Sequence, residues 1–244
     1  CFSKMKNNIL IILPTVNEEK NIENLYKKIK KLKYKFKYLF IDDGSTDGTL
    51  EAIKNIKNNN KKNIFLLKRK KRLGIGKAHK DGLIWAYKKK IDYVITMDTD
   101  FAHEPKYIPN LLKKMRSSDL VLGSRYLKKN STPNWPKFRV FLSTGAHIVC
   151  KILFNLNLDT TNAFRFYNLK KIDRNFIKKC ESNDYDFFFT SLVVLNLYKY
   201  RISQIPMVIK NRTEGVSKML VQHMIKSVFN MFFLFLKVKL GLFK

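Results

Sequence analysis

The sequence predicts an α/β fold with a largely parallel sheet, built as one domain with a C-terminal extension. In the first half of the chain, short apolar runs alternate with amphipathic segments of helical periodicity. This order is typical of a parallel sheet whose strands are joined by helices. The chain has 244 residues, of which 45% are hydrophobic and 13% aromatic. That composition excludes global disorder, and the length is sufficient to bury a core.

Five apolar runs in the first half predict strands, and they are Ile9–Leu13, Tyr38–Ile41, Asn63–Leu67, Tyr93–Met97 and Leu120–Leu122. Helical periodicity between them predicts helices near residues 18–32, 47–59, 76–90 and 105–116. At the start of the first helix, Thr15 and Glu18 have the spacing of a capping box, in which each side chain would bind the backbone N–H of the other.

The pattern changes after about residue 125. A polar loop with Pro133 and Pro136 precedes helical segments near 138–156 and 184–198, a strand at Ile202–Ile209 and a last helix near 218–243. No flexible linker separates the two halves. We therefore expect a single domain over residues 1–217 and an amphipathic helix over 218–244.

The chain is strongly basic, because 49 Lys and Arg stand against 19 Asp and Glu and give a net charge of +30. Nucleic acid is not the expected partner. The apolar stripe Ile22, Leu25, Ile29 and Leu32 leaves the neighbouring lysines on a solvated helix face. A basic nucleic-acid-binding α/β protein is kept as a remote alternative. An anionic membrane surface is the expected partner, since each Lys or Arg near such a surface contributes roughly 1 kcal/mol.

The last helix is the candidate for contact with that membrane. Val228, Phe232, Phe233, Phe235 and Leu236 stand there among lysines, a composition that suits a helix lying in the interface. Packing of this helix on the core is the alternative. No apolar stretch reaches the roughly 18 residues of a membrane span, and three cysteines without metal-ligand spacing favour a reducing compartment. We expect a cytoplasmic protein, peripheral on the cytoplasmic face of a membrane.

Polar clusters follow four of the predicted strands, and they are Pro14–Glu19, Asp42–Thr49, Asp98–Asp100 and Gly123–Tyr126. The carboxyl ends of parallel strands meet at one edge of a sheet, where ligands bind, so these clusters should form one site. Two carboxylates, Asp98 and Asp100, suit Mg²⁺ or Mn²⁺ when substrate phosphates complete the coordination. An acidic helix-capping turn is the alternative for this pair.

Arginine is scarce, since only nine of the 49 basic residues are Arg. Four of the nine lie in or near polar clusters rather than on Lys-rich faces, namely Arg125, Arg139, Arg165 and Arg212. Because a guanidinium binds phosphate in a bidentate manner, these positions indicate a phosphate-bearing ligand. Asp43 has two interpretations, a carboxylate that binds the base or ribose of a nucleotide or a simple turn residue.

Together these motifs resemble the family 2 glycosyltransferases of the GT-A fold, and among them the dolichyl- and polyprenyl-phosphate mannose synthases. The resemblance rests on PTVNEEKNI, IDDGSTDGT, RLGIGKAHKDGL, MDTDFAHEP, VLGSRY, the TTNAFRFY region and NRTEGVSK, which span residues 13–218 in family order. It implies a Rossmann-like sheet and inverting, metal-dependent transfer of a single sugar, with mannose from GDP-mannose favoured, to polyprenyl or dolichyl phosphate. A family 2 enzyme acting on a glycan or small-molecule hydroxyl is the alternative.

The resemblance also implies roles for individual residues. Asp98 and Asp100 would hold the metal, and Asp100 and Arg125 would be catalytic. The phosphates of donor or acceptor would contact Arg125, Arg212 and Lys218, and Arg139 is added to this acceptor set because of its place near a polar cluster. The nucleotide-sugar donor would be bound by Pro14, Val16, Glu18, Ile41, Asp43, Asp98, Thr99, Asp100 and Arg125.

Three positions depart from the family pattern. Ala102 stands where Gln or Ser is frequent, the stretch Thr161–Arg165 lacks the usual Gly, and Thr190 replaces a frequent Glu. The missing Glu would matter for a hydroxyl acceptor, which needs a general base. A phosphate monoester needs none, because its second pKa is about 6 and it is largely dianionic at neutral pH.

Overall fold

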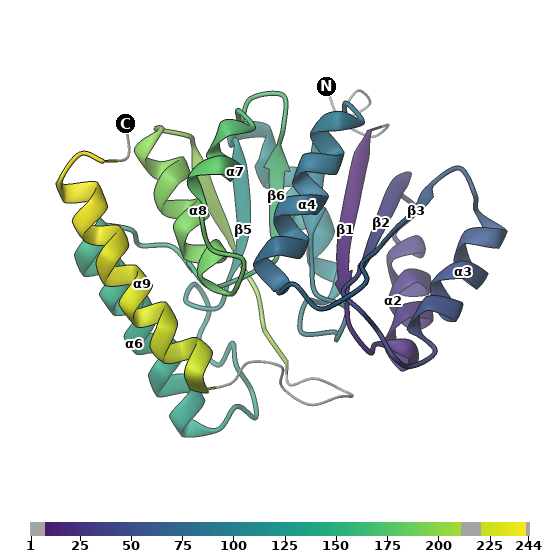
Figure 1. Ribbon diagram of the computed structural model, residues 1–244. Helices are drawn as coiled ribbons and strands as arrows, with labels where there is room; N and C mark the ends of the chain where they lie inside the picture. The colour runs from purple at the N-terminus through teal and green to yellow at the C-terminus, as the bar shows by residue number, and fades with distance from the viewer. Residues whose placement is uncertain (1–7, 211–220, 243–244) are drawn as a thin grey trace.

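The computed structural model describes residues 8–210 and 221–242. Within these ranges seven strands form one sheet in the order β3-β2-β1-β4-β6-β5-β7 (Figure 1). The strands are β1 (Ile9–Thr15), β2 (Phe36–Asp42), β3 (Ile64–Lys68), β4 (Tyr93–Thr96), β5 (Leu120–Ser124), β6 (Arg165–Asn168) and β7 (Ile202–Pro206). The predicted α/β fold with a largely parallel sheet is confirmed.

One strand runs against the others. β1 pairs in parallel with β2 and β4, β2 with β3, and β5 with β7, whereas β6 is antiparallel to both β4 and β5. The sequence analysis did not predict β6. Its insertion between β4 and β5 places the segment before it, residues 159–164, directly beside the ends of those two strands.

Helices cover both faces of the sheet. The helices are α2 (Glu19–Lys30), α3 (Thr49–Asn59), α4 (Ile75–Lys88), α5 (Ile108–Lys114), α6 (Lys137–Phe154), α7 (Asn175–Lys179), α8 (Asp186–Leu197) and α9 (Val221–Lys239). One core cluster joins α2, α3 and α5 to the sheet, and a second joins α4, α7 and α8 to the opposite face. Ile11 belongs to the first cluster and Ile12 to the second, which explains why β1 is a continuous apolar run.

The two longest described helices, α6 and α9, pack side by side at one end of the sheet (Figure 1). A third cluster, which includes Cys150 of α6, Phe189 of α8 and Met231 of α9, holds them on the domain. The predicted last helix is therefore packed on the core along one side. Its predicted boundary at residues 217/218 lies outside the described ranges. No helix in those ranges combines the length and hydrophobicity needed to cross a bilayer.

The predicted capping box is wrong. Thr15 is the last residue of β1, and its hydroxyl donates to the carbonyl of Ile41 at 3.3 Å. The helix begins at Glu19, and the carboxylate of Glu18 accepts from Nδ2 of Asn21 at 2.8 Å. Thr15 is held in register with Asp42 of β2, so its side chain is committed to the sheet rather than to the helix end.

Candidate functional site

The ends of β1 and β2 form one corner of the site. The N–H of Asp43 donates to the carbonyl of Thr15 at 2.9 Å, and the N–H of Glu18 donates to Oγ1 of Thr49 at 2.8 Å. Pro14 and Ile41 are neighbours in the strand register. The structure thus brings together the predicted donor residues at the ends of these strands and just beyond them, namely Pro14, Val16, Glu18, Ile41 and Asp43.

Asp43 is buried and anchors the loop between β3 and α4. Its Oδ1 accepts from Nη1 of Arg69 and from the N–H of Leu73, both at 2.9 Å, and its Oδ2 accepts from the N–H of Gly74 at 3.1 Å. Gly74 has a φ of 96°, and a Cβ there would lie 2.7 Å from the carbonyl oxygen of Asn183. Glycine is therefore required at this turn. Arg69 was not predicted as a site residue, because it stands within a run of surface lysines.

Beside it, Asp42 presents a polar atom with no partner. Its Oδ2 accepts from the N–H of Ser45 at 3.2 Å, whereas its Oδ1 is buried without a hydrogen bond. A buried acceptor left unsatisfied is costly, by about 1–3 kcal/mol. This oxygen lies at the end of β2, where the donor is expected, and a ligand N–H or O–H would satisfy it.

The acid pair lies immediately beyond β4 and is tied to β1. Thr99, between the two acids, donates from Oγ1 to the carbonyl of Pro14 at 3.3 Å. Asp100 is buried, and its Oδ1 accepts from the N–H of Ala102 at 3.0 Å. Phe101 adopts a left-handed φ of 62°, a conformation that costs about 1–3 kcal/mol and is frequent at functional sites.

His103 also belongs to this corner. Its Nδ1 accepts from the N–H of Asp98 at 3.0 Å, and its ring stacks on Phe164 with 5.4 Å between the centroids. Because Nδ1 is the acceptor, the neutral ring carries its proton on Nε2. His103 thereby fixes the backbone of the first acid. No role for His103 was predicted from the sequence.

We tested whether these residues fit a divalent cation. No group of three or more His, Cys, Asp or Glu side chains within residues 8–210 and 221–242 is arranged to hold a metal unaided. Mg²⁺, however, is usually bound by one or two carboxylates together with substrate phosphates and water. Asp98, whose side chain is 32% exposed, and Asp100 supply that set. The residues fit a cation shared with a diphosphate.

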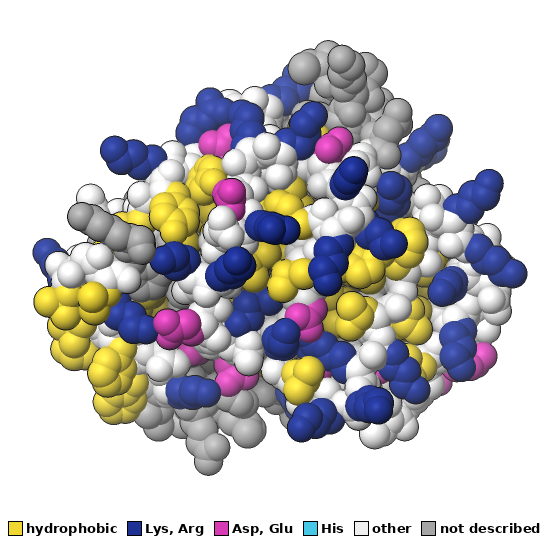
Figure 2. All heavy atoms as spheres, turned by 45° about the horizontal axis from the view of Figure 1, so that its top comes forward, with side chains coloured by type: hydrophobic (Ala, Val, Ile, Leu, Met, Phe, Trp, Pro, Cys, Tyr) yellow, Lys and Arg dark blue, Asp and Glu magenta, His cyan; other side chains and the backbone are white. Residues whose placement is uncertain are grey.

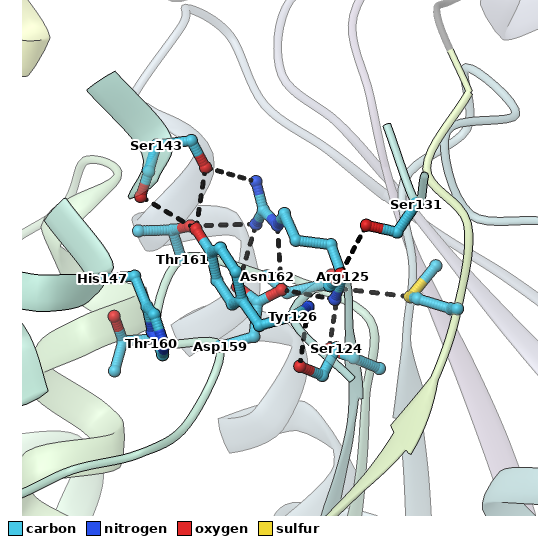
Figure 3. A network of polar contacts seen from close by, with 12 residues as sticks. Ser124, Arg125, Tyr126, Ser131, Ser143, His147, Asp159, Thr160, Thr161 and Asn162 are labelled. Carbon is cyan, nitrogen blue, oxygen red and sulfur yellow. Dashed lines mark hydrogen bonds and ion pairs between the residues drawn. The ribbon is translucent and has the colours of Figure 1, made fainter. Parts of the chain in front are cut away.

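A second corner is built around Arg125, directly after β5 (Figure 3). Its Nε and Nη2 donate to the carboxylate of Asp159 at 2.8 and 2.9 Å. Its Nη1 donates to Ser143 at 3.1 Å, and its Nη2 also donates to Thr161 at 2.9 Å. Burial by itself would lower the pKa of Arg125, but the adjacent Asp159 carboxylate offsets it and the pKa is raised. Arg125 is thus held rigidly, with its charge balanced by Asp159.

A cavity of about 120 Å³ adjoins this network. Arg125, Ser143 and Trp135 line it, and the remaining lining residues are Tyr126, Ser131, Thr132, Val140 and Thr144. The guanidinium carbon of Arg139 lies 3.8 Å from the centroid of the Trp135 ring, and that of Arg125 lies 5.5 Å from it. Trp135 therefore makes cation–π contacts with both predicted phosphate-binding arginines, of which Arg125 lines the cavity.

The segment before β6 connects the two corners. Thr161 accepts from Arg125, the carbonyl of Ala163 accepts from Oγ1 of Thr96 at 2.6 Å, and Phe164 stacks on His103. The acid pair and the arginine cavity are thus fixed by one short stretch of backbone. Asp159 and Thr161 were missed, because their positions depend on the pairing of β6.

The other predicted residues have different outcomes. Arg165 is fully buried and donates to Ser191 at 2.8 Å and to the carbonyl of Phe188 at 2.7 Å, so its interpretation as a phosphate ligand is wrong. Thr190 is buried within α8. Arg212 and Lys218 lie outside the described residues.

Comparison with known proteins identifies the family. The model of glycosyl transferase family 2 matches residues 10–190, so the chain belongs to this family and is a glycosyltransferase. It is 29% identical over 212 residues to the undecaprenyl-phosphate mannosyltransferase of Micrococcus luteus, covering 86% of this chain and 87% of that protein. It is 26% identical over 212 residues to the polyprenol monophosphomannose synthase of Mycolicibacterium smegmatis, covering 86% and 80%.

Solved structures support the GT-A fold. The glucosyl-3-phosphoglycerate synthase of Mycobacterium tuberculosis, in complex with phosphoglyceric acid, superposes with a TM-score of 0.68 at 15% identity and covers 96% of this chain and 84% of that one. A structure of the same enzyme with Mg²⁺ and UDP gives a TM-score of 0.65 at 16% identity, covering 95% and 83%.

Proposed function

We propose that this family 2 glycosyltransferase transfers a single mannosyl residue, with inversion, from GDP-mannose to a polyprenyl phosphate in a reaction dependent on Mg²⁺ or Mn²⁺. The observation that carries the proposal is the cavity lined by Arg125 and by Trp135, on whose ring Arg139 also stacks, because its eight lining residues include no acid. All eight belong to the described part of the chain.

The lining of this cavity distinguishes between acceptor classes. A hydroxyl acceptor needs a general base to remove its proton, and a carboxylate is a common choice for that role. A phosphate monoester is already largely dianionic at neutral pH and instead needs cationic hydrogen-bond donors. Among the described residues, the acid bound to Arg125 is Asp159, whose two carboxylate oxygens already accept from Nε and Nη2 of that arginine. A phosphate acceptor matches this chemistry better than a hydroxyl.

The donor is assigned to the corner formed by β1, β2 and the acid pair. The two curated relatives bear names that specify mannosyl transfer to undecaprenyl phosphate and synthesis of polyprenol monophosphomannose, and these names support mannose as the sugar. The M. tuberculosis enzyme of the same fold binds Mn²⁺ or Mg²⁺ together with UDP, which supports a divalent cation. In this chain Asp42 Oδ1 would accept a hydrogen bond from the donor.

In the mechanism, an oxygen of the acceptor phosphate forms a bond to the anomeric carbon, and the nucleoside diphosphate leaves with the electron pair of the broken bond. Negative charge on the leaving diphosphate would be stabilised by a divalent cation when one is bound. Asp98 and Asp100 would hold that cation. Arg139 and the remaining N–H of Arg125 would orient the acceptor phosphate, while Trp135 and Asp159 keep the two guanidinium groups in place.

We further propose that the chain consists of a catalytic domain, residues 1–217, and a membrane-contacting helix, residues 218–244. Along the described part of α9, Phe229, Phe232, Phe233 and Leu236 are exposed on the side away from the core. Figure 2 shows hydrophobic side chains gathered at the left edge of the molecule, at the end where α6 and α9 lie, on a face where Lys and Arg are interspersed with further hydrophobic groups. An anionic membrane, from the cytoplasmic side, fits both features, and nucleic acid fits only the charge.

The test is a transfer assay with labelled GDP-mannose, UDP-glucose or UDP-N-acetylglucosamine, a polyprenyl phosphate and Mn²⁺ or Mg²⁺. Label extracted into organic solvent from GDP-mannose alone, and lost on chelation, is the expected result. Arg139→Gln should raise the acceptor KM by about tenfold or more, and the exposed Arg174→Gln serves as the matched control. Release of nucleoside diphosphate only when glycan hydroxyls are supplied would replace the proposal with the hydroxyl-acceptor alternative.

A further inference from the structure

Asn162 is buried between the strand ends that carry the two corners of the site, and only 2% of its surface is exposed. It precedes β6 and lies among the residues that surround Arg125 in Figure 3. Its Nδ2 donates to the carbonyl of Gly123 at 2.8 Å, and its Oδ1 accepts from the N–H of Phe164 at 2.9 Å. Both ends of this side-chain amide are therefore bound to backbone groups of the site.

The two hydrogen bonds lead to the two corners. Gly123 lies in β5, and Arg125 comes directly after that strand. Phe164 stacks on His103, which in turn holds the N–H of Asp98. A change of the side chain at position 162 would therefore alter the position of the guanidinium relative to the first acid.

Two further buried side chains hold the backbone on which Asn162 stands. Oγ1 of Thr96 in β4 donates to the carbonyl of Ala163 at 2.6 Å. The fully buried Arg165 donates from Nε to the carbonyl of Asn162 at 2.8 Å and from Nη2 to that of Thr160 at 3.1 Å. Because burial of a guanidinium is costly unless its N–H groups are hydrogen-bonded, these contacts tie the charge to this stretch of backbone. Arg165 thus orients Asn162 rather than a ligand.

The packing around the amide is tight. A Cβ at Gly123 would overlap Sδ of Met207 and lie 3.1 Å from Cδ1 of Phe164, so β5 and the start of β6 approach closely at this point. Nδ2 of Asn162 also donates to the same sulfur at 3.2 Å. An amide turned the other way would place its oxygen against the carbonyl oxygen of Gly123, so the partners fix its orientation. Asn162 is a spacer of fixed length between β5 and β6.

We propose that Asn162 is a positioning residue, which sets the distance between the donor at the acid pair and the acceptor phosphate at Arg125. The inference rests on the proposed function, because it takes both substrates to occupy these corners. A misplacement of about 1 Å can lower a reaction rate about 10²-fold. Asn162 touches neither substrate in this assignment. Its loss should therefore slow the chemical step and leave the binding of each substrate unchanged.

The experiment measures the single-turnover rate constant for transfer from GDP-mannose to farnesyl phosphate with Mn²⁺, which separates chemistry from binding and product release. Asn162→Ala should lower this rate constant by about 10–100-fold. The KM for farnesyl phosphate, and the Kd for GDP with Mn²⁺ by calorimetry, should each change less than about twofold. A purely structural role would lower the melting temperature and leave the rate constant of the folded enzyme unchanged.

Asn168→Ala is the matched control. Asn168 is also buried, and its Oδ1 likewise accepts a backbone N–H, that of Lys170, at 3.2 Å. It lies at the opposite end of β6, where it pairs with Tyr93 at the start of β4. This variant should lower the melting temperature, as Asn162→Ala does, but it should not change the rate constant.

Thr96→Val provides a second route to the same displacement. Valine keeps the shape of the side chain but removes the hydrogen bond to Ala163, so the segment before β6 loses its connection to β4. Transfer should slow by about tenfold, again with unchanged binding of GDP. This variant decides the question if Asn162→Ala does not fold.

The outcomes are distinguishable. If the wild-type enzyme transferred to neither farnesyl phosphate nor a longer polyprenyl phosphate, the proposed function would be overturned, and this assignment with it. Transfer by wild type, with rate constants that Asn162→Ala and Thr96→Val leave unaltered, would overturn only the assignment of Asn162. A slower rate accompanied by an equally large loss of GDP or acceptor binding would also overturn it, because Asn162 would then support one corner rather than the distance between the two.

Discussion

Asp98 and Asp100 stand two residues apart but have different surroundings. Asp100 is buried and its Oδ1 is already fixed by the N–H of Ala102, whereas the side chain of Asp98 is one-third exposed. The backbone around them is held by Thr99 on Pro14 and by His103 on the N–H of Asp98. The pair is therefore positioned before any ligand arrives, and the cation-binding role that we propose for it would depend on charge rather than on rearrangement.

Asp100→Asn tests this dependence on charge. The amide keeps the size of the side chain and can still accept from Ala102, so the melting temperature should change little. Turnover should fall by at least about 10²-fold, the size of effect found for loss of a single charge-stabilising group. The measurement is the initial rate over a Mn²⁺ titration, together with the Mn²⁺ dependence of GDP binding by calorimetry. Near-normal turnover would remove Asp100 from the site.

His79 is the other residue with a measurable electrostatic consequence. It is fully buried in α4, and neither ring nitrogen has a hydrogen-bond partner. Burial, together with the nearby Arg165 guanidinium, lowers its pKa from 6.5 to about 3. Between these two values the unfolded chain binds a proton that the folded chain does not, so stability falls as the pH falls below 6.5 and does not depend on this group above it.

His79→Leu should therefore flatten the acid side of the stability profile. From pH 6.5 to 5, wild type should lose about 2 kcal/mol more than the variant, since each pH unit in this window contributes about 1.4 kcal/mol. The measurement is denaturant unfolding of both proteins at pH 7.5, 6.5, 5.5 and 5. Carboxylate contributions are common to the two proteins and cancel in the difference. Parallel profiles would contradict the buried neutral histidine.

At the scale of elements, the first half of the fold was predictable and the second was less so. Every residue of β1 is buried, and most of them form an uninterrupted apolar run. Such a run can be recognised from the local sequence alone. β6 has only four residues, Arg165–Asn168, and carries a charged residue at its start. It forms because β4 and β5 pair with it in antiparallel register, which no local periodicity encodes.

The same reasoning applies to the site. The acid pair and each of the strand-end motifs consist of residues that are adjacent in sequence, so they could be predicted from it. The partner of Arg125, Asp159, is 34 residues away and meets it only through the pairing of β6. Trp135 was passed over because nothing in a loop sequence predicts which side chain will stack on Arg139. Contacts made by long-range pairing are the part that sequence patterns do not contain.

The polar contacts that attach α9 to the start of α8 can be tested by mutation. Asp186, buried at the start of α8, accepts from Oγ of Ser227 at 2.8 Å and from Nδ2 of Asn230, while Lys226 and Asp184 form an exposed ion pair at 3.2 Å. Asn230→Ala leaves a buried carboxylate undersatisfied, which costs about 1–3 kcal/mol, whereas Lys226→Ala removes a pair worth about 0–1 kcal/mol. Hydrogen exchange of α9 should accelerate about tenfold or more in the first variant and little in the second. Equal exchange in both would mean that apolar packing alone holds the helix.

On the scale of the whole molecule, charge and apolar surface are arranged to act together. The net charge of +30 is spread over the surface seen in Figure 2, while the exposed aromatic residues of α9 are confined to one end. Long-range attraction to anionic lipid would bring the protein to a membrane, and insertion of α9 side chains would fix its orientation. The two contributions respond differently to salt, so they can be separated.

Measuring the binding of the protein to vesicles at increasing ionic strength separates the electrostatic contribution from that of the α9 side chains. At about 0.05 M salt, vesicles rich in anionic lipid should bind the protein strongly, and at about 0.5 M the affinity should fall at least about tenfold, because the Debye length becomes shorter than the spacing of surface charges. Neutral vesicles should bind weakly and independently of salt, through α9 alone. Replacing Phe232 and Phe233 by Ser should remove this salt-independent part, and Leu197→Ser, an exposed leucine on α8, is the control. If binding were equal on neutral and anionic vesicles at every salt concentration, the charge would have no part in membrane attachment, and the high lysine content would need another explanation.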